Sequence, residues 1–125
     1  MLILDSDVLI EILRKGSHRG VEALETLKAL DDDIVTTAIN IHEVLYGLIK
    51  RDKHLPDLMR IRALPYTRGD ASLSASLEIH VEQEGTPSGR TDTMIAAVAI
   101  NNNAKLYTFN RSHFHSFTGK GLILV

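Results

Sequence analysis

The chain of 125 residues contains no cysteine, which excludes a disulfide framework, a thiolate nucleophile and a cysteine-ligated zinc site. It has no apolar run near the roughly 20 residues that a membrane-spanning helix needs, so no membrane segment is expected. The first residues also lack the basic segment, apolar stretch and small-residue cleavage site of a signal peptide, so none is expected. These absences favour a cytoplasmic location.

Acidic residues are missing from residues 93–125, although the whole chain has a formal net charge of −2. The overall charge therefore gives no support for nucleic-acid binding, and only local basic clusters could provide it. Two such clusters occupy residues 14–19 and 50–54.

The composition is that of an ordinary folded domain, with 44% hydrophobic and 24% charged residues. No internal repeat, low-complexity tract or linker interrupts the chain. The length and the even composition predict a single domain over residues 1–125.

Strands alternate with helices, which predicts an α/β fold: a central parallel sheet of four to five strands with helices on both faces. The continuous apolar run Leu2–Leu4 predicts a strand buried on both faces. Apolar or β-branched runs predict the other strands at residues 33–37, 64–67, 105–109 and 122–125. Apolar spacing predicts helices at residues 7–15, 17–30, 41–49, 56–63, 70–84 and 91–100. Asn40 and Asp70 are predicted to cap the third and fifth helices.

Four polar residues are predicted to lie at the carboxyl edge of this sheet, where open parallel sheets form their sites. Asp5 ends the first strand, and Glu43 lies one turn into the helix after the second strand. Asp92 starts the alanine-rich helix, and Asn110 follows the strand at residues 105–109. Each could instead be a helix cap, a solvated helix residue or a turn residue. However, no Lys or Arg at an obvious spacing neutralises the acids, and carboxylate oxygens suit Mg²⁺ or Mn²⁺.

Four segments of the chain resemble the PIN-domain ribonucleases, and most closely the VapC-type toxins of prokaryotic toxin–antitoxin pairs. They are LDSDVLI at 4–10, TTAINIHEVLYGL at 36–48, TDTMIAAVAI at 91–100 and TFNRSHF at 108–114. The resemblance spans essentially the whole chain and implies a PIN-like α/β/α sandwich. It further implies an Mg²⁺- or Mn²⁺-dependent endoribonuclease that hydrolyses RNA, a homodimer, and a small VapB-like antitoxin as partner.

Carried over residue by residue, the resemblance makes Asp5, Glu43 and Asp92 the acidic metal site, with Asp5 as the principal ligand. Asn110 stands where the family often has a fourth acid, so the resemblance leaves open whether one or two metal ions bind. Asp7 stands where the family usually has Asn, and it is predicted to cap the first helix and to support Asp5. A contribution of Asp7 to the metal site itself is left open.

Further polar residues near these segments receive supporting roles. Ser6 and Thr108 are predicted to orient water, and Arg90 and Arg111 are predicted to contact phosphate. The histidines of the last loop, His113 among them, are predicted to have surface or packing roles.

Two alternative functions stay open. The sequence Asp5-Ser6-Asp7 after a strand also fits a haloacid-dehalogenase-like phosphotransferase, but Val8 and Leu9 replace the expected Gly-Thr. A receiver domain would share the layout and the acidic pocket, but this chain lacks a suitable phosphoacceptor. The second alternative is a catalytically weak PIN-like binding module that works through an antitoxin or a nucleic-acid partner.

Overall fold

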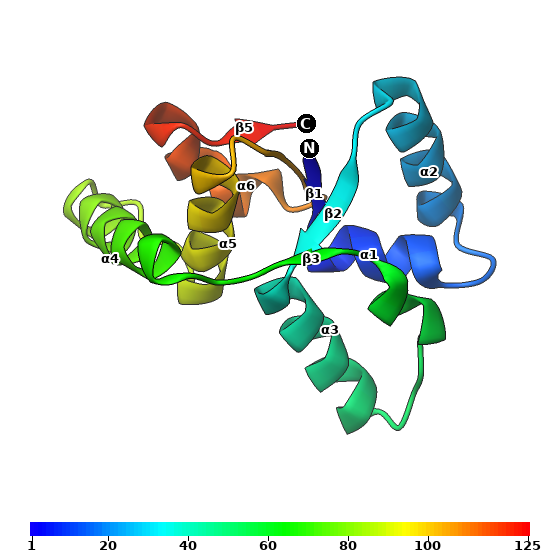
Figure 1. The fold of residues 1–125 in the computed structure, drawn as a ribbon. Helices are drawn as coiled ribbons and strands as arrows, with labels where there is room; N and C mark the ends of the chain where they lie inside the picture. Colours follow the sequence, from blue (N-terminus) through cyan, green and yellow to red (C-terminus); the bar gives the residue numbers. More distant parts are fainter.

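The computed structural model describes all residues, 1–125, and contains a five-stranded parallel sheet between two layers of helices (Figure 1). The strand order is β3-β2-β1-β4-β5, and every neighbouring pair is parallel. The strands are β1 (Leu2–Leu4), β2 (Ile34–Thr37), β3 (Ala63–Leu64), β4 (Lys105–Tyr107) and β5 (Ile123–Leu124). The predicted α/β fold with a central parallel sheet is therefore confirmed.

Helices cover both faces of this sheet. The first layer consists of α1 (Ser6–Leu13), α2 (His18–Leu30), α3 (Ala38–Lys50) and the short 3₁₀ helix η1 (Pro56–Arg60). The second layer consists of α4 (Arg68–Gln83), α5 (Arg90–Asn101), α6 (Arg111–Phe114) and the 3₁₀ helix η2 (His115–Lys120). In Figure 1 the second layer lies to the left of the strands, and α1 and α2 lie to the right. None of the helices combines the length and the apolar character that a membrane crossing requires.

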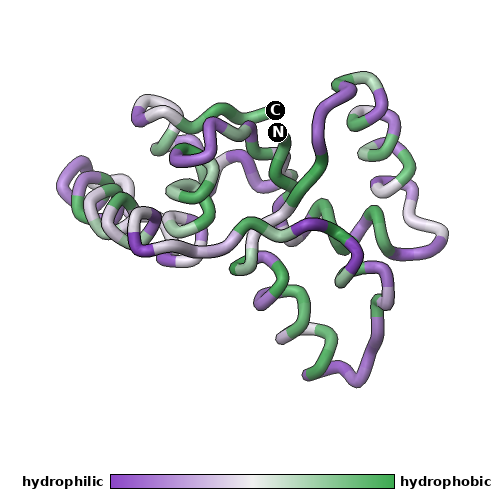
Figure 2. Tube along the Cα trace, in the orientation of Figure 1, coloured by the Kyte–Doolittle hydropathy of each residue, from purple (hydrophilic) through white to green (hydrophobic).

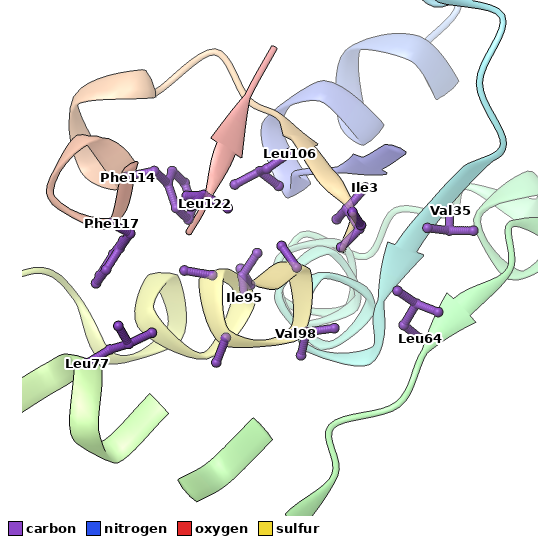
Figure 3. Packing of buried hydrophobic residues seen from close by; sticks show 14 of the residues in the cluster. Ile3, Val35, Leu64, Leu77, Ile95, Val98, Leu106, Phe114, Phe117 and Leu122 are labelled. Atoms are coloured by element: carbon purple, nitrogen blue, oxygen red, sulfur yellow. The ribbon is translucent and has the colours of Figure 1, made fainter. Parts of the chain in front are cut away.

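Strand β1 divides the core into two clusters because its side chains alternate between the two faces of the sheet. Ile3 packs with the second layer, where Figure 3 shows Ile95 of α5 on the side of Leu106 and Val98 on the side of Leu64. The flanking residues of β1, Leu2 and Leu4, pack with α1, α2, α3 and η1. β1 is thus buried on both faces, as its continuous apolar run predicts.

Helix α5 is the most deeply buried helix of the fold. Its residues 95–99 are fully buried. Four of the seven residues from Met94 to Ile100 have small side chains, namely three Ala and one Val. Small side chains allow α5 to lie close to both α4 and the sheet. Figure 2 shows the hydrophobic character of this helix and of the central strands. The first turn of α5 is thereby fixed at the edge of the sheet.

The structure corrects several predicted boundaries. The helix predicted at residues 56–63 ends at Arg60, because Ala63 belongs to β3 and pairs with Thr36 of β2. The predicted strand at residues 105–109 ends at Tyr107. The last loop, to which His113 was assigned, instead contains α6 and η2.

Two predicted helix caps are also wrong. The N-cap of α3 is Thr37, whose hydroxyl accepts a hydrogen bond from the backbone N–H of Asn40 at 3.1 Å. The N-cap of α4 is Thr67, and Asp70 is its reciprocal partner in a capping box. In both cases the cap is a threonine that lies three residues before the predicted one.

Candidate functional site

Three acidic side chains from three separate elements gather at the carboxyl edge of the sheet. Asp5 directly follows β1, Glu43 lies in the second turn of α3, and Asp92 lies in the first turn of α5. Their proximity is visible in the pKa of Asp92, which is raised to about 6 by burial and by the negative charges of Asp5 and Glu43. The structure therefore brings together the three acids that the sequence singles out.

Asp5 is the most firmly held of these acids, with only 7% of its surface exposed. Its Oδ2 accepts a hydrogen bond from Thr108 Oγ1 at 2.7 Å, and Thr108 directly follows β4. Its Oδ1 accepts hydrogen bonds from Asn40 Nδ2 and from the backbone N–H of Ser6, each at 2.9 Å. Asp5 is therefore also the N-cap of α1. Because both oxygens are bonded to groups at the ends of neighbouring elements, the orientation of the carboxylate is fixed.

Asn40 is a site residue that the sequence analysis missed. It is completely buried, and its Nδ2 donates to Asp5 Oδ1 and also to Ser6 Oγ at 3.0 Å. Its Oδ1 accepts a hydrogen bond from Thr37 Oγ1 at 2.6 Å. A signal was present, because Asn40 lies three residues before Glu43 and residues at that spacing share a helix face. A polar residue on the same face as a candidate ligand is a candidate for orienting it.

Glu43 is connected to Asp5 through a short chain of hydrogen bonds. Ser6 Oγ donates to Glu43 Oε1 at 2.9 Å and accepts from Asn40, which in turn donates to Asp5. Ser6 and Thr108 were predicted to orient water. In the structure their hydroxyl groups hold the carboxylates of Glu43 and Asp5 instead.

Asp92 differs from Asp5 and Glu43 because no hydrogen-bond donor of the chain holds it. The N-cap residue Gly89 offers no side chain, and the side chain of Asp92 remains 23% exposed. Its one basic neighbour is His113, whose Nδ1 lies 3.4 Å from Asp92 Oδ2. This contact lowers the pKa of Asp92 but does not cancel the effects of burial and of the neighbouring acids. His113, predicted to have a surface or packing role, thus reaches the site from α6.

A fourth carboxylate, that of Asp7, lies beside the other three. Burial and the charge of Asp5 raise its pKa, and its own charge adds to the raised pKa of Asp92. Oδ1 of Asp7 accepts a long hydrogen bond of 3.4 Å from the backbone N–H of Phe109, and Oδ2 is buried without a partner. The predicted capping role of Asp7 is wrong, because Asp5 occupies the N-cap position of α1.

With this geometry in hand, comparisons with known proteins identify the family. The sequence model of the PIN domain matches residues 2–119, which is nearly the whole chain. The chain belongs to the PIN-domain family. A sequence search of curated proteins found no significant match.

Solved structures with the same PIN fold come from bacterial VapBC complexes. VapBC2 from Rickettsia felis, bound to a DNA fragment from its promoter, is 26% identical with a TM-score of 0.78, and the match covers 99% of this chain and 96% of that chain. VapBC-1 from nontypeable Haemophilus influenzae is 20% identical with a TM-score of 0.78 and the same coverage. A toxin–antitoxin complex from Klebsiella pneumoniae is 21% identical with a TM-score of 0.74, covering 100% and 96%. The predicted resemblance to a VapC-type PIN domain is confirmed.

PIN domains are generally nucleases, and the family assignment favours this class over the phosphotransferase and receiver alternatives. Asn110, at the position where the family often has a fourth acid, lies at the N-terminus of α6 with an exposed side chain. Its backbone N–H donates to Thr108 Oγ1 at 3.0 Å, so it buttresses the threonine that holds Asp5. No acid follows Asp92 in the chain, so no later residue replaces the missing carboxylate.

The two arginines that were predicted to contact phosphate are engaged elsewhere. Arg90 Nε lies 3.1 Å from Glu78 Oε1 of α4, and Arg111 Nη1 donates to the carbonyl oxygen of Val125. Positive charge at this PIN site therefore comes from other residues. One is Arg19, whose guanidinium lies 4.0 Å above the ring of Phe109 and lowers the pKa of the adjacent Asp7.

The donor set of this PIN site consists of carboxylate oxygens, the ligands that hard divalent cations prefer. As the side chains lie, no three acidic or histidine residues are arranged to hold an ion together. Asp5 and Glu43 instead share the hydroxyl and amide donors of Ser6 and Asn40. An incoming cation would therefore exchange with these hydrogen bonds.

Proposed function

We propose that this PIN domain is an Mg²⁺- or Mn²⁺-dependent endoribonuclease that hydrolyses RNA phosphodiester bonds. It acts as the toxin of a VapBC-type toxin–antitoxin system in the cytoplasm. The observation that carries this proposal is the gathering of Asp5, Glu43 and Asp92 at the carboxyl edge of the sheet, in a chain of a nuclease family. The single-domain architecture over residues 1–125 belongs to the same proposal.

The carboxylate oxygens of Asp5, Glu43 and Asp92 fit a divalent cation by their chemistry, and the side chains would reorient to bind it together. Asp5 would be the principal ligand, and Glu43 and Asp92 would bind directly or through water. Two unit charges about 4 Å apart repel by about 4 kcal/mol at an effective dielectric constant near 20, and a cation would remove such repulsion. The pKa of Asp92 is raised first by burial and then by repulsion from the neighbouring acids. When bound, the cation supplies Lewis-acid stabilisation of the charge that develops on the phosphate and lowers the pKa of a bound water.

The remaining residues position these acids. Thr108 and Asn40 hold the two oxygens of Asp5, and Ser6 holds Glu43, so the carboxylates are oriented before substrate arrives. Asn110 would offer a neutral carbonyl oxygen, either to the cation or to a water. The ligand set would then carry one negative charge fewer than a set with an acid at position 110, although Asp7 lies beside it as a further carboxylate, and a phosphate oxygen of the substrate could supply the missing ligand.

The direct test is RNA cleavage by the purified protein with Mg²⁺, with Mn²⁺ and with EDTA. Sequencing of RNA ends after induction in cells would identify the cleaved bonds. Asp5→Asn keeps the shape of the side chain and should abolish cleavage. Glu82→Gln, an exposed substitution on α4 outside the site, should cleave like the wild type. Full metal-dependent cleavage by Asp5→Asn would contradict the assignment.

A second candidate function is a catalytically weak binding module. The observation in its favour is Asn110, because the loss of one carboxylate weakens the attraction of the site for cations. Calorimetric titration with Mg²⁺ and Mn²⁺ separates the two candidates. Binding to the wild type but not to Asp5→Asn supports the nuclease, whereas binding to neither protein supports the binding module.

The proposal includes a small VapB-like antitoxin and a homodimer. The antitoxin is suggested by the neighbours that are VapBC complexes, such as VapBC2 of Rickettsia felis. Large apolar side chains on α3 and η1 remain exposed and offer surface for a partner, among them Tyr46, Ile49 and Met59. Light scattering of the purified protein, alone and co-expressed with a protein encoded beside it, would measure both assemblies.

A further inference from the structure

A groove of about 580 Å³ starts at Glu43 and is bounded by α1, α3 and the loop between α3 and η1. Its apolar lining consists of Ile10, Val44, Leu48 and Leu55. Its basic lining consists of Arg14, Arg51, Lys53 and His54. Glu43 is the only acidic residue that lines it, so the groove connects the acidic edge of the sheet to a basic surface.

The basic side chains of this groove are not neutralised by the rest of the chain. Arg51, Lys53 and His54 form no ion pair, and Arg14 lies 3.7 Å from Glu11, its only acidic partner. The loop that carries three of the four is exposed and hydrophilic, as Figure 2 shows at the end of α3. In a chain with a net charge of −2, this local excess of positive charge fits an anionic ligand.

We propose that this groove binds the single-stranded RNA segment that flanks the bond cleaved at the acidic site. This inference rests on the proposed function, because it extends the substrate outward from Glu43. Arg14, Arg51 and Lys53 contact backbone phosphates, and the apolar lining packs against ribose and base. Acidic side chains at the point of cleavage repel an RNA strand, so flanking cations are needed to hold it. The groove contains no Phe, Tyr or Trp, and His54 offers its only ring for base stacking, so its binding is governed by the backbone rather than by base identity.

The experiment measures binding of a fluorescent single-stranded RNA of about 12 nucleotides by anisotropy, in EDTA so that no cleavage occurs, over a range of salt concentrations. The groove variant is Arg51→Ala/Lys53→Ala. The matched control is Lys28→Ala/Arg68→Ala, which removes two exposed cations that neither line the groove nor form ion pairs. Loss of two phosphate contacts should reduce the slope of log K against log salt by about 1.4 and therefore weaken binding by about 25-fold near 0.1 M salt. The control should match the wild type.

A charge-conserving variant, Arg51→Lys/Lys53→Arg, should bind RNA like the wild type and so separates loss of charge from loss of folding. If the groove variant has the same salt slope and RNA affinity as the wild type, the inference is wrong. An acidic protein segment would then be the ligand that fits the groove. That result would not affect the proposed nuclease, which is judged by cleavage. Conversely, charge-dependent RNA binding in the groove without cleavage by the wild type would refute the nuclease and retain the groove.

Discussion

The substitution Asp92→Asn should stabilise the metal-free protein near neutral pH, although it removes a residue proposed to act in catalysis. In the wild type, burial and the charges of Asp5 and Glu43 make the ionised form of Asp92 unfavourable, so its pKa rises from 3.8 to about 6. Asparagine has nearly the same shape and no charge. The variant therefore keeps the packing of the first turn of α5 and loses the electrostatic penalty.

The size and pH dependence of the effect follow from the two pKa values. A rise from 3.8 to about 6 corresponds to at most about 3 kcal/mol, because one pKa unit equals about 1.4 kcal/mol. The folded state holds the proton more tightly than the unfolded chain, so wild-type stability falls as pH rises from about 4 to about 6. Above about pH 6 the full penalty is present, and below about pH 4 this contribution disappears. The attraction of Asp92 to His113 is already included in the pKa of about 6, so about 1–3 kcal/mol is expected for the variant above pH 6.

Urea denaturation in EDTA at a series of pH values measures this difference directly. Glu82→Gln, an exposed neutralisation on α4, serves as the control for the loss of one charge. With Mg²⁺ at about 100 times its dissociation constant, the wild type should gain about 2.7 kcal/mol, and Asp92→Asn should gain less. The reasoning fails if Asp92→Asn is no more stable than the wild type near pH 7.5, or if its advantage is as large near pH 4.

Four further substitutions test the structure. Asn40→Ala removes the donor to Asp5, so unfolding free energy should fall by about 1–3 kcal/mol in urea and Mg²⁺ affinity by about 10–100-fold in calorimetry; unchanged values would refute its positioning role. Gly20→Ala should lose about 1–3 kcal/mol, because its Cβ would lie 2.1 Å from the Glu11 carbonyl oxygen. Gly47→Ala, whose Cβ would meet nothing within 4 Å, should gain up to about 1 kcal/mol, and equal melting temperatures for the two variants would contradict this contrast. Asn110→Asp should tighten Mg²⁺ binding or add a second ion in calorimetry, and an unchanged isotherm would exclude residue 110 from the metal site.

The parts of the fold that were predictable are those that local sequence determines. The run Leu2–Leu4 has no polar interruption, so a buried strand followed by an acid at its carboxyl end could be expected. The spacing of apolar residues in α3 and the small side chains of α5 likewise define which faces are buried. Because parallel strands all end at one edge, Asp5, Glu43 and Asp92 could be expected to lie together.

What could not be predicted depends on contacts between residues far apart in the chain. Asn40 and Thr37 are both good capping residues by type, and only the approach of β1 to α3 assigns Asn40 to Asp5. Arg90 lies only two residues before Asp92, but the start of α5 directs it to Glu78 of α4. His113 reaches Asp92 only because residues 111–114 form a helix, which the short polar sequence after β4 did not indicate.

The hydrogen bonds of the site divide its acids into two groups, and this division indicates where a compensating positive charge is needed. On the side of β1, β4 and α3, the donors Thr108, Asn40 and Ser6 hold Asp5 and Glu43. Asp92 receives no hydrogen bond, and its pKa is raised by burial and by its acidic neighbours. Hydrogen bonds from the protein orient Asp5 and Glu43. No hydrogen bond offsets the effect of burial and of the neighbouring acids on Asp92. Above about pH 6 the folded chain therefore keeps a negative charge at the first turn of α5 that no hydrogen bond offsets, and a cation held by Asp5 would offset it.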